Sequence, residues 1–600
     1  MSVQLLNERD IEFLLFEFLD TESLLSRPRY QEHSRETFTA SLATAKGIAE
    51  KLFANHAAKG DENEPQFVDG KVQLIPETQA AWDAFAEAGF LAAHCEFEQD
   101  GMQLPEVVLR TALSYFMAAN VASAAYPLLC IGAANLIDSF GSDEQKAKFL
   151  PPMRDGRFAG TMALTEPDQG SALGDITTTA VPQDDGSYLI TGQKIYISGG
   201  DQSLTDNIVH MVLARIKGAP VGVKGISLFI VPKVMVNDDG SLGERNDVAL
   251  AGLLHKMGYR NTTSTVLSFG EKGGAVGYLV GEPHKGLGYM FQMMNEARIG
   301  VGTGAAVLAY QGYNNSLEYA RERPQGRLPS SKNPESKQVP IVQHADVKRM
   351  LLAQKAYSEG GLALCLYGSS LFEDSHTAAT EEERKQAFLL LDLLTPIIKT
   401  WPSKYGLKSN ELAIQIYGGA GYIREYPVER LYRDQRLNPI HEGTEGIQGL
   451  DLLGRKVPMG KMAGFQSFVG LVKSTIEAAN ANAELSALGD QLAQGLQQLQ
   501  TITAELLPRL AEDPDRGLAN ATLYLDVFGR VTVSWVWLRQ ALIAAEKLQG
   551  DLTEDDQNFF KGKLQAARYY IEWELPEIEP QIRLLSAGNT TPFDMQNDWF

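Results

Sequence analysis

Residues 416–448 read IYGGAGYIREYPVERLYRDQRLNPIHEGTEGIQ, and the rest of the chain is organised around this stretch. Its glycine cluster, Gly418-Gly419-Ala420-Gly421, ends an apolar run with helical spacing, where glycines allow a positive φ and a close backbone approach. Its second part, His441-Glu442-Gly443-Thr444, places a carboxylate just before another apolar helix. Such a carboxylate can face a cleft and act as a general base. Acidic residues are also common at helix starts, and taken alone the two motifs favour ordinary helix ends.

The composition is typical of a globular chain with several cores. The 600 residues are 44% hydrophobic and 22% charged, and this length predicts about three to five domains. The formal net charge of −21 argues against nucleic acid or an anionic membrane as a bulk partner. A phosphate-bearing ligand would therefore be held by local Arg or Lys side chains, helix N-termini and backbone amides.

The cysteines and the N-terminus indicate a cytoplasmic protein. Cys95, Cys130 and Cys365 lie in apolar contexts without metal-ligand spacing, so we expect them to be buried and reduced and expect no bound metal. The first ten residues, MSVQLLNERD, lack the basic-then-apolar pattern of a secretion signal. We identify no apolar run of membrane-spanning length and expect no membrane partner.

Hydrophobic patterning divides the chain into four regions and predicts an α+β fold. Residues 1–155 carry apolar stripes at helical spacing and predict an N-terminal helical domain. Short β-favouring runs in residues 156–280 predict a β-barrel or sandwich. Long helices in residues 281–464 predict a four-helix bundle, completed by the helix after Glu442. Residues 465–600 predict an additional helical domain.

Individual elements follow from the same periodicities and from turn and capping signals. The expected helices include residues 77–93, 104–124, 287–319, 345–372, 381–420, 485–510, 522–548 and 553–582, and a capping box starts a helix at Ser142. The expected strands are residues 158–164, 176–181, 188–191, 194–197, 208–215 and 225–231, with β-structure continuing to about Leu279. Residues 55–72 and 328–340 are polar, and we expect loops there.

Two stretches of the β region carry polar groups that suit a planar polar ligand. Thr165–Ser171 reads TEPDQGS and brings a hydroxyl, a turn and a Gly-Ser pair into one loop. Gly192–Ser198 reads GQKIYIS and places Tyr196 and Ser198 on one face of a strand, because they are two residues apart. Taken singly, the two stretches are more simply an ordinary turn and an ordinary amphipathic strand.

Taken together, these motifs resemble those of the acyl-CoA dehydrogenase flavoproteins. That family carries Thr-Glu-Pro-x-x-Gly-Ser and then Gly-x-Lys-x-x-Ile-Ser/Thr, as the two β-region stretches do. Its closing segment has Gln-x-x-Gly-Gly-x-Gly, Glu-Tyr-Pro-Val-Glu-Arg, an Arg-Asp pair and Glu-Gly-Thr, which match Gln415–Gly421, Glu425–Arg430, Arg433-Asp434 and Glu442–Thr444. The resemblance covers about residues 80–460, with the main motifs in order.

The resemblance implies that the chain binds FAD. The residues that would hold it are Met162, Leu164, Thr165, Gly170, Ser171, Tyr196 and Ser198 in the β region, and Arg323, Gln325, His344, Gln415, Gly418, Gly419 and Thr444 in the helical region. Many relatives have Trp in place of Tyr196, whose ring can still stack on a flavin. Arg323 stands where the family has an Arg that reaches the flavin pyrophosphate across a subunit interface, although the aromatic residue of that motif is missing. His344 stands where many relatives have Gln.

The resemblance also implies the substrate side of the site. The expected catalytic base is Glu442, and the expected acyl-CoA contacts are Ser171, Asn295, Arg298 and Gly443. Arg298 lies on a helix rich in small residues, so it needs an anionic partner or a route to solvent. Residues 122–129 (ASAAYPLL) would form the pocket floor. Their small apolar side chains favour a medium or long straight acyl chain, which Tyr126 could shorten.

The implied activity is FAD-dependent dehydrogenation of a fatty acyl-CoA to trans-2-enoyl-CoA in β-oxidation, with electron-transferring flavoprotein as the acceptor. An acyl-CoA oxidase is the closest alternative. A flavin-containing relative of the DNA-alkylation-response proteins would need a basic stripe on the C-terminal domain, whereas residues 465–600 carry many acids. A structural protein on an inactive scaffold is disfavoured by the intact Glu442-Gly443-Thr444.

The C-terminal region adds a further expectation about subgroup and assembly. Longer members of the family, including the methylthiopropionyl-CoA and very-long-chain dehydrogenases, also have a C-terminal helical extension. Cofactor contacts shared across subunits imply at least a homodimer, and the extra domain could block the tetramer common among shorter relatives.

Overall fold

The structure, a computed structural model, describes residues 4–600 apart from the side chains of residues 291–294. It contains two compact units. The first consists of the chain up to Arg35, Glu106–Thr111 and Arg298–Phe600, and the second of Glu36–Pro105 and Ala112–Ala297. The predicted helical, β and helical regions are all present, so the α+β fold class is confirmed.

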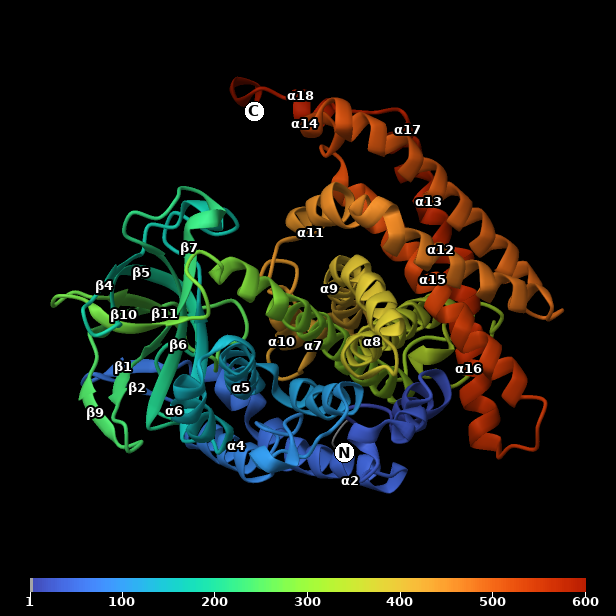
Figure 1. Ribbon diagram of the computed structural model, residues 1–600. Helices are drawn as coiled ribbons and strands as arrows, with labels where there is room; N and C mark the ends of the chain where they lie inside the picture. Colours follow the sequence, from blue (N-terminus) through green and yellow to red (C-terminus); the bar gives the residue numbers. More distant parts are fainter. Residues whose placement is uncertain (1–3) are drawn as a thin grey trace. The chain divides into compact units, whose positions relative to one another are not determined.

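The helices of residues 35–154 precede the β region along the chain. They are α2 (Arg35–Ile48), α4 (Pro76–Glu87), α5 (Glu106–Phe140) and α6 (Asp143–Arg154) (Figure 1). The predicted capping box is confirmed, because Ser142 and Gln145 exchange hydrogen bonds at the start of α6. Helix α5 contains a kink at Asn120 and continues to Phe140, beyond the end predicted at residue 124.

Helix α5 is, among the described residues, the one helix long and apolar enough to cross a membrane, with a mean hydropathy of 1.5 in its most apolar window. The prediction that no apolar run reaches this length is therefore wrong on length and composition. However, 78% of that window is buried inside the protein, as in the core helix of a globular domain.

The loop predicted at residues 55–72 is only partly correct. This segment contains α3 (Ala57–Glu62) and a hairpin of β1 (Gln66–Val68) and β2 (Lys71–Gln73). Both residues of the connecting Asp69-Gly70 pair have positive φ, +52° and +78°. Two-residue hairpin turns require positive φ, and Asp-Gly is a favoured pair for them.

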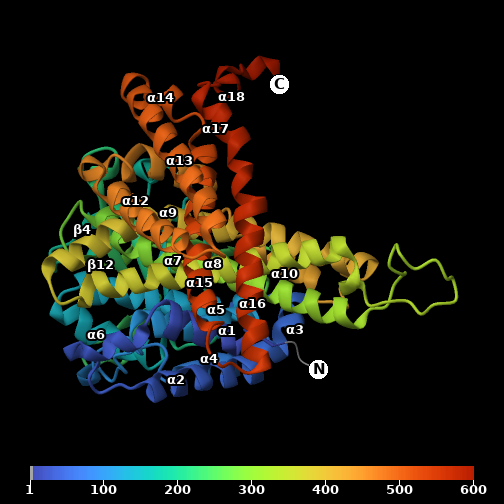
Figure 2. The same ribbon diagram turned by 90° about the vertical axis from the view of Figure 1, so that its right-hand side faces the viewer.

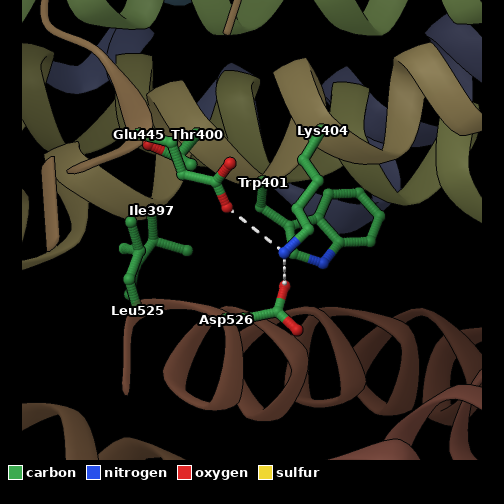
Figure 3. A pocket seen from close by; sticks show the side chains of 7 residues that line it. All are labelled: Ile397, Thr400, Trp401, Lys404, Glu445, Leu525 and Asp526. Carbon is green, nitrogen blue, oxygen red and sulfur yellow. Dashed lines mark ion pairs between the residues drawn. The ribbon is translucent and has the colours of Figure 1, made fainter. Parts of the chain in front are cut away.

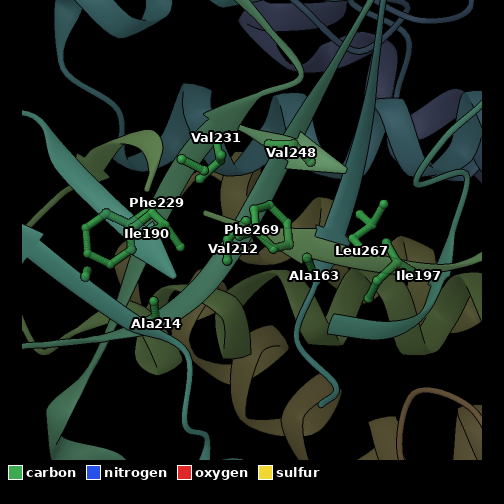
Figure 4. Packing of buried hydrophobic residues seen from close by; sticks show 12 residues of the cluster. Ala163, Ile190, Ile197, Val212, Ala214, Phe229, Val231, Val248, Leu267 and Phe269 are labelled. Carbon is green, nitrogen blue, oxygen red and sulfur yellow. The ribbon is translucent and has the colours of Figure 1, made fainter. Parts of the chain in front are cut away.

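An eight-stranded sheet forms the β region, in the order β10-β11-β5-β12-β7-β6-β3 with β4 paired to β5 and β6. Its strands are β3 (Phe158–Ala163), β4 (Thr179–Pro182), β5 (Tyr188–Ser198), β6 (Asn207–Ile216), β7 (Ile226–Pro232), β10 (Val248–Leu253), β11 (Ser264–Phe269) and β12 (Ala275–Val280). A separate hairpin pairs β8 (Val234–Val236) with β9 (Leu242–Arg245). Buried side chains such as Ile190, Val212, Phe229 and Phe269 form the core of the eight-stranded sheet (Figure 4).

The strand predictions are correct in position but not in number. The runs at residues 188–191 and 194–197 form one strand, β5, because its first half pairs with β12 and its second half with β11. The strand predicted at residues 176–181 begins only at Thr179. The β-structure ends at Val280, close to the predicted limit.

Three long helices follow, α7 (Gly286–Glu322), α8 (Ala345–Thr377) and α9 (Glu381–Tyr417), and α8 packs against α9 (Figure 1). The last two confirm the predicted antiparallel pair. The predicted helix after Glu442 is α11 (Glu445–Asp451), which continues into a π-helical turn at Leu452–Lys456. The exposed loop between α7 and α8, predicted at residues 328–340, extends from a base where Gln325 N–H donates to Val339 O at 2.9 Å (Figure 2).

The predicted additional helical domain is also present. Its main helices are α12 (Met459–Asn480), α13 (Ser486–Glu512), α15 (Ala521–Lys547), α16 (Glu554–Tyr569) and α17 (Ile578–Ser586) (Figure 2). Helix α12 is absent from the prediction, because Gly464 and Gly470 interrupt its apolar stripe. The helix predicted at residues 553–582 is broken by a turn at Leu575–Glu577, where Pro576 has no backbone N–H to donate.

Buried ion pairs fix this domain to the rest of its unit. Lys563 Nζ on α16 lies 2.5 Å from Asp10 Oδ1 near the N-terminus and 2.8 Å from Glu359 Oε2 on α8. Asp526 Oδ1 on α15 lies 3.0 Å from Lys404 Nζ on α9. Buried charges need partners, so these pairs specify how the additional helices dock. The three cysteines are free and buried, as predicted.

Candidate active site

Glu442 lies on a strained turn between α10 (Val428–Gln435) and α11. Its φ is +53°, and that of Gly443 is +90°. A positive φ is unfavourable for a residue with a Cβ, so the surroundings must hold Glu442 in this conformation. Thr444 ends the turn as the N-cap of α11, where its hydroxyl accepts a hydrogen bond from Ile447 N–H.

Two buried side chains hold the carbonyl groups of this turn. Gln448 Nε2 donates to Glu442 O at 3.0 Å, and Lys399 Nζ on α9 donates to Gly443 O at 2.7 Å. A Cβ on Gly443 would lie 2.5 Å from Gln448 Nε2. The positive φ and this close contact together require glycine after the carboxylate.

The electrostatics of the turn suit a proton acceptor. Burial raises the pKa of Glu442 above its ordinary value of 4.5, although the charges of Arg298 and Lys399 act in the opposite direction. Burial lowers the pKa of Lys399 to about 8, against the attraction of Glu442. Burial and the Lys399 charge lower the pKa of His441 to about 3, so this imidazole is neutral at pH 7. A carboxyl whose pKa is raised toward neutrality can accept a proton as a general base.

Arg298 on α7 has the anionic partner that its sequence context required. Its Nη1 lies 2.9 Å from Asp451 Oδ2, and both side chains are largely buried. Arg455 holds the other carboxylate oxygen of Asp451 at 2.7 Å. Arg298 Nε, in contrast, is buried without a hydrogen-bond partner among the described residues. The contacts of Arg298 and of the half-buried Asn295 with CoA stay predictions.

In the second unit, Glu166 fixes the loop after β3. Its carboxylate accepts hydrogen bonds from the backbone N–H and hydroxyl groups of both Thr177 and Thr178, and Lys194 Nζ lies 2.9 Å from Oε1. Lys194 Nζ also donates to Leu164 O at 2.9 Å. Burial opposes ionisation of Glu166, but Lys194 and the threonine donors outweigh it and lower the pKa to about 2.

The two predicted β-region motifs are thereby brought together. Besides the Lys194 contacts, Ile195 N–H donates to Thr165 O at 2.9 Å, which joins the loop after β3 to β5. Met162 and Leu164 are half-buried at the end of β3. Their position beside the Tyr196 strand agrees with a shared role for the two motifs.

Several of these β-region groups remain available to a ligand. Tyr196 is 65% exposed with a φ of +60°. The hydroxyls of Thr165, Ser171 and Ser198 make no side-chain hydrogen bond within the described chain. A Cβ on Gly170 would meet no atom within 4 Å. An exposed aromatic ring near free hydroxyls and an open glycine fits a flat, polar ring system such as a flavin.

The remaining predicted cofactor residues form two groups in the first unit, and all but the half-buried His344 are exposed. Arg323 is exposed, and the described chain gives its guanidinium no partner. Nearby, His344 Nε2 lies 2.7 Å from Gln325 O. The other group, at the C-terminal end of α9, consists of Gln415, Gly418 and Gly419. Their contacts with FAD stay predictions.

Sequence reasoning missed Glu166, Lys194, Lys399 and Gln448 as parts of the site. Glu166 and Lys194 lie inside the two β-region motifs, TEPDQGS and GQKIYIS, but the sequence analysis assigned roles only to their neighbours. Lys399 directly follows the apolar run at residues 387–398. A lysine in a stripe that must be buried signals a buried charge, and this signal was available.

A small pocket beside helix α9 contains two ion pairs. It is lined by Ile397, Thr400, Trp401, Lys404, Glu445, Leu525 and Asp526 (Figure 3). Lys404 Nζ lies 3.2 Å from Glu445 Oε1 and 3.0 Å from Asp526 Oδ1. Because these charges satisfy one another, the pocket links α9, α11 and α15 rather than offering a ligand site.

Family comparisons agree with this arrangement. Models of the acyl-CoA dehydrogenase N-terminal, middle and C-terminal domains match residues 36–157, 161–271 and 284–457, and a model named acetyl-CoA dehydrogenase C-terminal like matches residues 468–596. Together they cover most of the chain, including the additional helical domain.

Individual relatives align over nearly the full length. The chain is 35% identical over 585 residues to 3-methylmercaptopropionyl-CoA dehydrogenase of Ruegeria pomeroyi, covering 97% of this chain and 98% of that protein. It is 34% identical over 586 residues to a broad-specificity linear acyl-CoA dehydrogenase of Mycobacterium tuberculosis, covering 95% of each. An FAD-complexed acyl-CoA dehydrogenase of Bacillus anthracis has the same fold, with a TM-score of 0.75 at 21% identity over 97% of this chain and 92% of that chain. The chain belongs to the acyl-CoA dehydrogenase family, in the longer subgroup with a C-terminal extension, and its cofactor is FAD.

Proposed function

We propose that this enzyme converts a straight-chain fatty acyl-CoA of medium to long chain length to trans-2-enoyl-CoA, with Glu442 as the α-proton base. The observation that carries this assignment is the Glu442 turn. A half-buried carboxyl with a raised pKa is held at a positive φ by side chains from α9 and α11. Strained, carefully supported carboxylates of this kind occur at catalytic positions.

The backbone of the turn also suits the chemistry. The α-hydrogen of a thioester is weakly acidic, and hydrogen bonds to the thioester oxygen lower the barrier by stabilising the enolate. The N–H of Glu442 makes no hydrogen bond within the described chain, so it is available as such a donor. Bound FAD supplies the acceptor for the β-hydride. The carboxylate of Glu442 holds the α-proton after transfer.

The relatives support an acyl-CoA as the substrate without agreeing on its chain length, since two of them are butyryl-CoA dehydrogenases, and the preference for a longer chain rests on one core residue. The names of the two relatives described above specify a methylmercaptopropionyl-CoA and linear acyl-CoAs. Tyr126 is buried, its hydroxyl donates to Asn261 O at 3.0 Å, and it accepts from Thr263 N–H at 2.9 Å. Because this hydroxyl is satisfied, the 122–129 segment presents no free phenol to an acyl chain, which favours an apolar straight chain.

The physiological setting is part of the same proposal. We propose a role in β-oxidation in the cytoplasm, with electron-transferring flavoprotein as the acceptor, and a homodimeric assembly. The exposed Arg323 supports the dimer, because a guanidinium without a partner among the described residues is suited to a phosphate held by a second subunit. The three buried free cysteines agree with a reducing compartment.

An anaerobic titration of the FAD-loaded enzyme with saturated acyl-CoAs of graded chain length tests this function. We expect bleaching of the oxidised flavin absorbance by straight chains of medium to long length. Failure of every acyl-CoA to bleach the flavin would overturn the proposal. Rapid reoxidation by oxygen during turnover would instead identify an acyl-CoA oxidase.

A further inference from the structure

Lys399 differs from the other buried lysines of the described chain. Lys194, Lys456 and Lys563 each form an ion pair with a carboxylate. Lys399 is equally inaccessible to solvent, but its hydrogen bond goes to a backbone carbonyl, Gly443 O, at 2.7 Å. A buried ammonium requires compensation. Its strongest attraction to a negative charge is to Glu442, which indicates a role directed at that carboxylate.

The bonded carbonyl lies at the centre of the strained turn. The peptide between Gly443 and Thr444 carries it, directly after two residues with positive φ. Gln448 Nε2 donates to the preceding carbonyl, Glu442 O, at 3.0 Å, and makes only a longer contact of 3.5 Å with Gly443 O. The two side chains therefore fix consecutive peptide groups and so the direction in which the Glu442 side chain leaves the backbone.

We propose that Lys399 is a positioning residue for Glu442, which fixes the Gly443 carbonyl and favours the ionised carboxylate through its positive charge. This inference rests on the proposed function, in which Glu442 takes the α-proton. It assigns to Lys399 two separable effects, one geometric and one electrostatic. The geometric effect acts on the rate of proton transfer, and the electrostatic effect acts on the pH range of activity.

Charged groups from α7, α9 and α11 act on Glu442 and Lys399. The positive charges of Arg298 on α7 and Lys399 on α9 both lower the pKa of Glu442. The charges of Glu442 and of Glu445 on α11 raise the pKa of Lys399, and that of Arg298 lowers it. His441 on the same turn is neutral near pH 7. Loss of Lys399 thus leaves Arg298 as the remaining positive charge acting on Glu442.

The test is the pH dependence of anaerobic flavin reduction, followed by stopped flow on FAD-loaded Lys399→Met, Lys399→Gln and Lys399→Arg. In Lys399→Met we expect the rate to fall by about 10- to 100-fold, with the acid limb of the profile moved upward by on the order of one pH unit. Lys399→Gln keeps a donor for Gly443 O, so it should recover part of the rate but keep the displaced limb. Lys399→Arg keeps the charge, so its limb should lie near that of the wild type.

The matched control is Lys404→Met, five residues along α9, whose partners are Glu445 and Asp526. Its acid limb should stay in place. The inference would be overturned if the acid limb of the pH profile stays at its wild-type position in both Lys399→Met and Lys399→Gln. If Lys399→Met does not fold, the position of the acid limb in Lys399→Gln is the deciding result. Glu442→Gln separates the two claims. Continued bleaching in that variant refutes the base itself, whereas lost bleaching beside an unmoved Lys399 limb refutes only the role of Lys399.

Discussion

Arg298 Nη1 lies 2.9 Å from Asp451 Oδ2, and this buried contact joins helix α7 to the short helix that follows the Glu442 turn. Removal of the carboxylate would leave a buried, uncompensated guanidinium. We predict that Asp451→Asn destabilises the protein by about 3 kcal/mol, measured as a shift in the chemical denaturation midpoint. Arg455→Met removes the largely exposed partner of the same carboxylate, and it should change stability by less than about 1 kcal/mol. Equal losses in both variants would contradict this account.

The Glu166–Lys194 pair should make the stability of the folded protein depend on pH in the acidic range. The folded-state pKa of Glu166 is about 2, below its ordinary value of 4.5. Its stabilising contribution is therefore complete above about pH 4.5 and is lost as the pH falls toward 2. In Glu166→Gln the denaturation midpoint should fall even at pH 7, because Lys194 becomes an unpaired buried charge.

A second variant tests the origin of that loss. The double variant Glu166→Gln/Lys194→Met removes both charges, so it should be more stable than Glu166→Gln alone by about 1–3 kcal/mol. Its midpoint should also show a weaker dependence on pH between 5 and 2 than that of the wild type. A double variant no more stable than the single one would show that the pair is not coupled.

Gly443 should tolerate no side chain. In Gly443→Ala the φ of +90° becomes strained and the new Cβ approaches Gln448 Nε2 to 2.5 Å. We predict a fall in the rate of flavin reduction of about 100-fold, since the base is displaced. The matched control is Gly446→Ala on α11, where the nearest atom to a Cβ is 3.9 Å away. That variant should keep a rate within about threefold of the wild type, because alanine is favourable in a helix.

The pH profile of the wild-type enzyme should report the environment of Glu442. Proton abstraction requires the ionised carboxylate, and burial raises the pKa of this group above 4.5. The rate of flavin reduction should therefore rise with pH through an apparent pKa above 4.5 and decline as the pH is lowered through it. A rate already at its plateau at pH 4.5 would contradict the raised pKa.

The sequence was informative wherever one local signal decided the outcome. The capping box at Ser142 begins α6, and periodicity located α8, α9 and α15. Prediction failed where tertiary contacts decide. The two short runs around Gly192 form a single strand because β11 and β12 pair along it, and helix α12 forms despite its glycines because its neighbours bury it.

At the candidate active site, too, local sequence signals were predictive and tertiary contacts were not. The motif around Glu442 was visible in the sequence, since a carboxylate preceded a glycine at a helix start. The contacts that tune it were not, because Lys399 precedes Glu442 by more than forty residues and reaches it through the packing of α9. Similarly, Glu166 in the loop after β3 pairs with Lys194 on β5, and their separation along the chain does not predict this contact.

The central claim is that Glu442 removes the α-proton, and anaerobic stopped-flow reduction of Glu442→Gln tests it most directly. The variant should still bind acyl-CoA, detected as a perturbation of the oxidised flavin spectrum, because glutamine keeps the shape of the side chain. We predict that its rate of flavin bleaching falls by about 1,000-fold or more at pH 7. Bleaching at the wild-type rate in this variant would show that another group takes the proton.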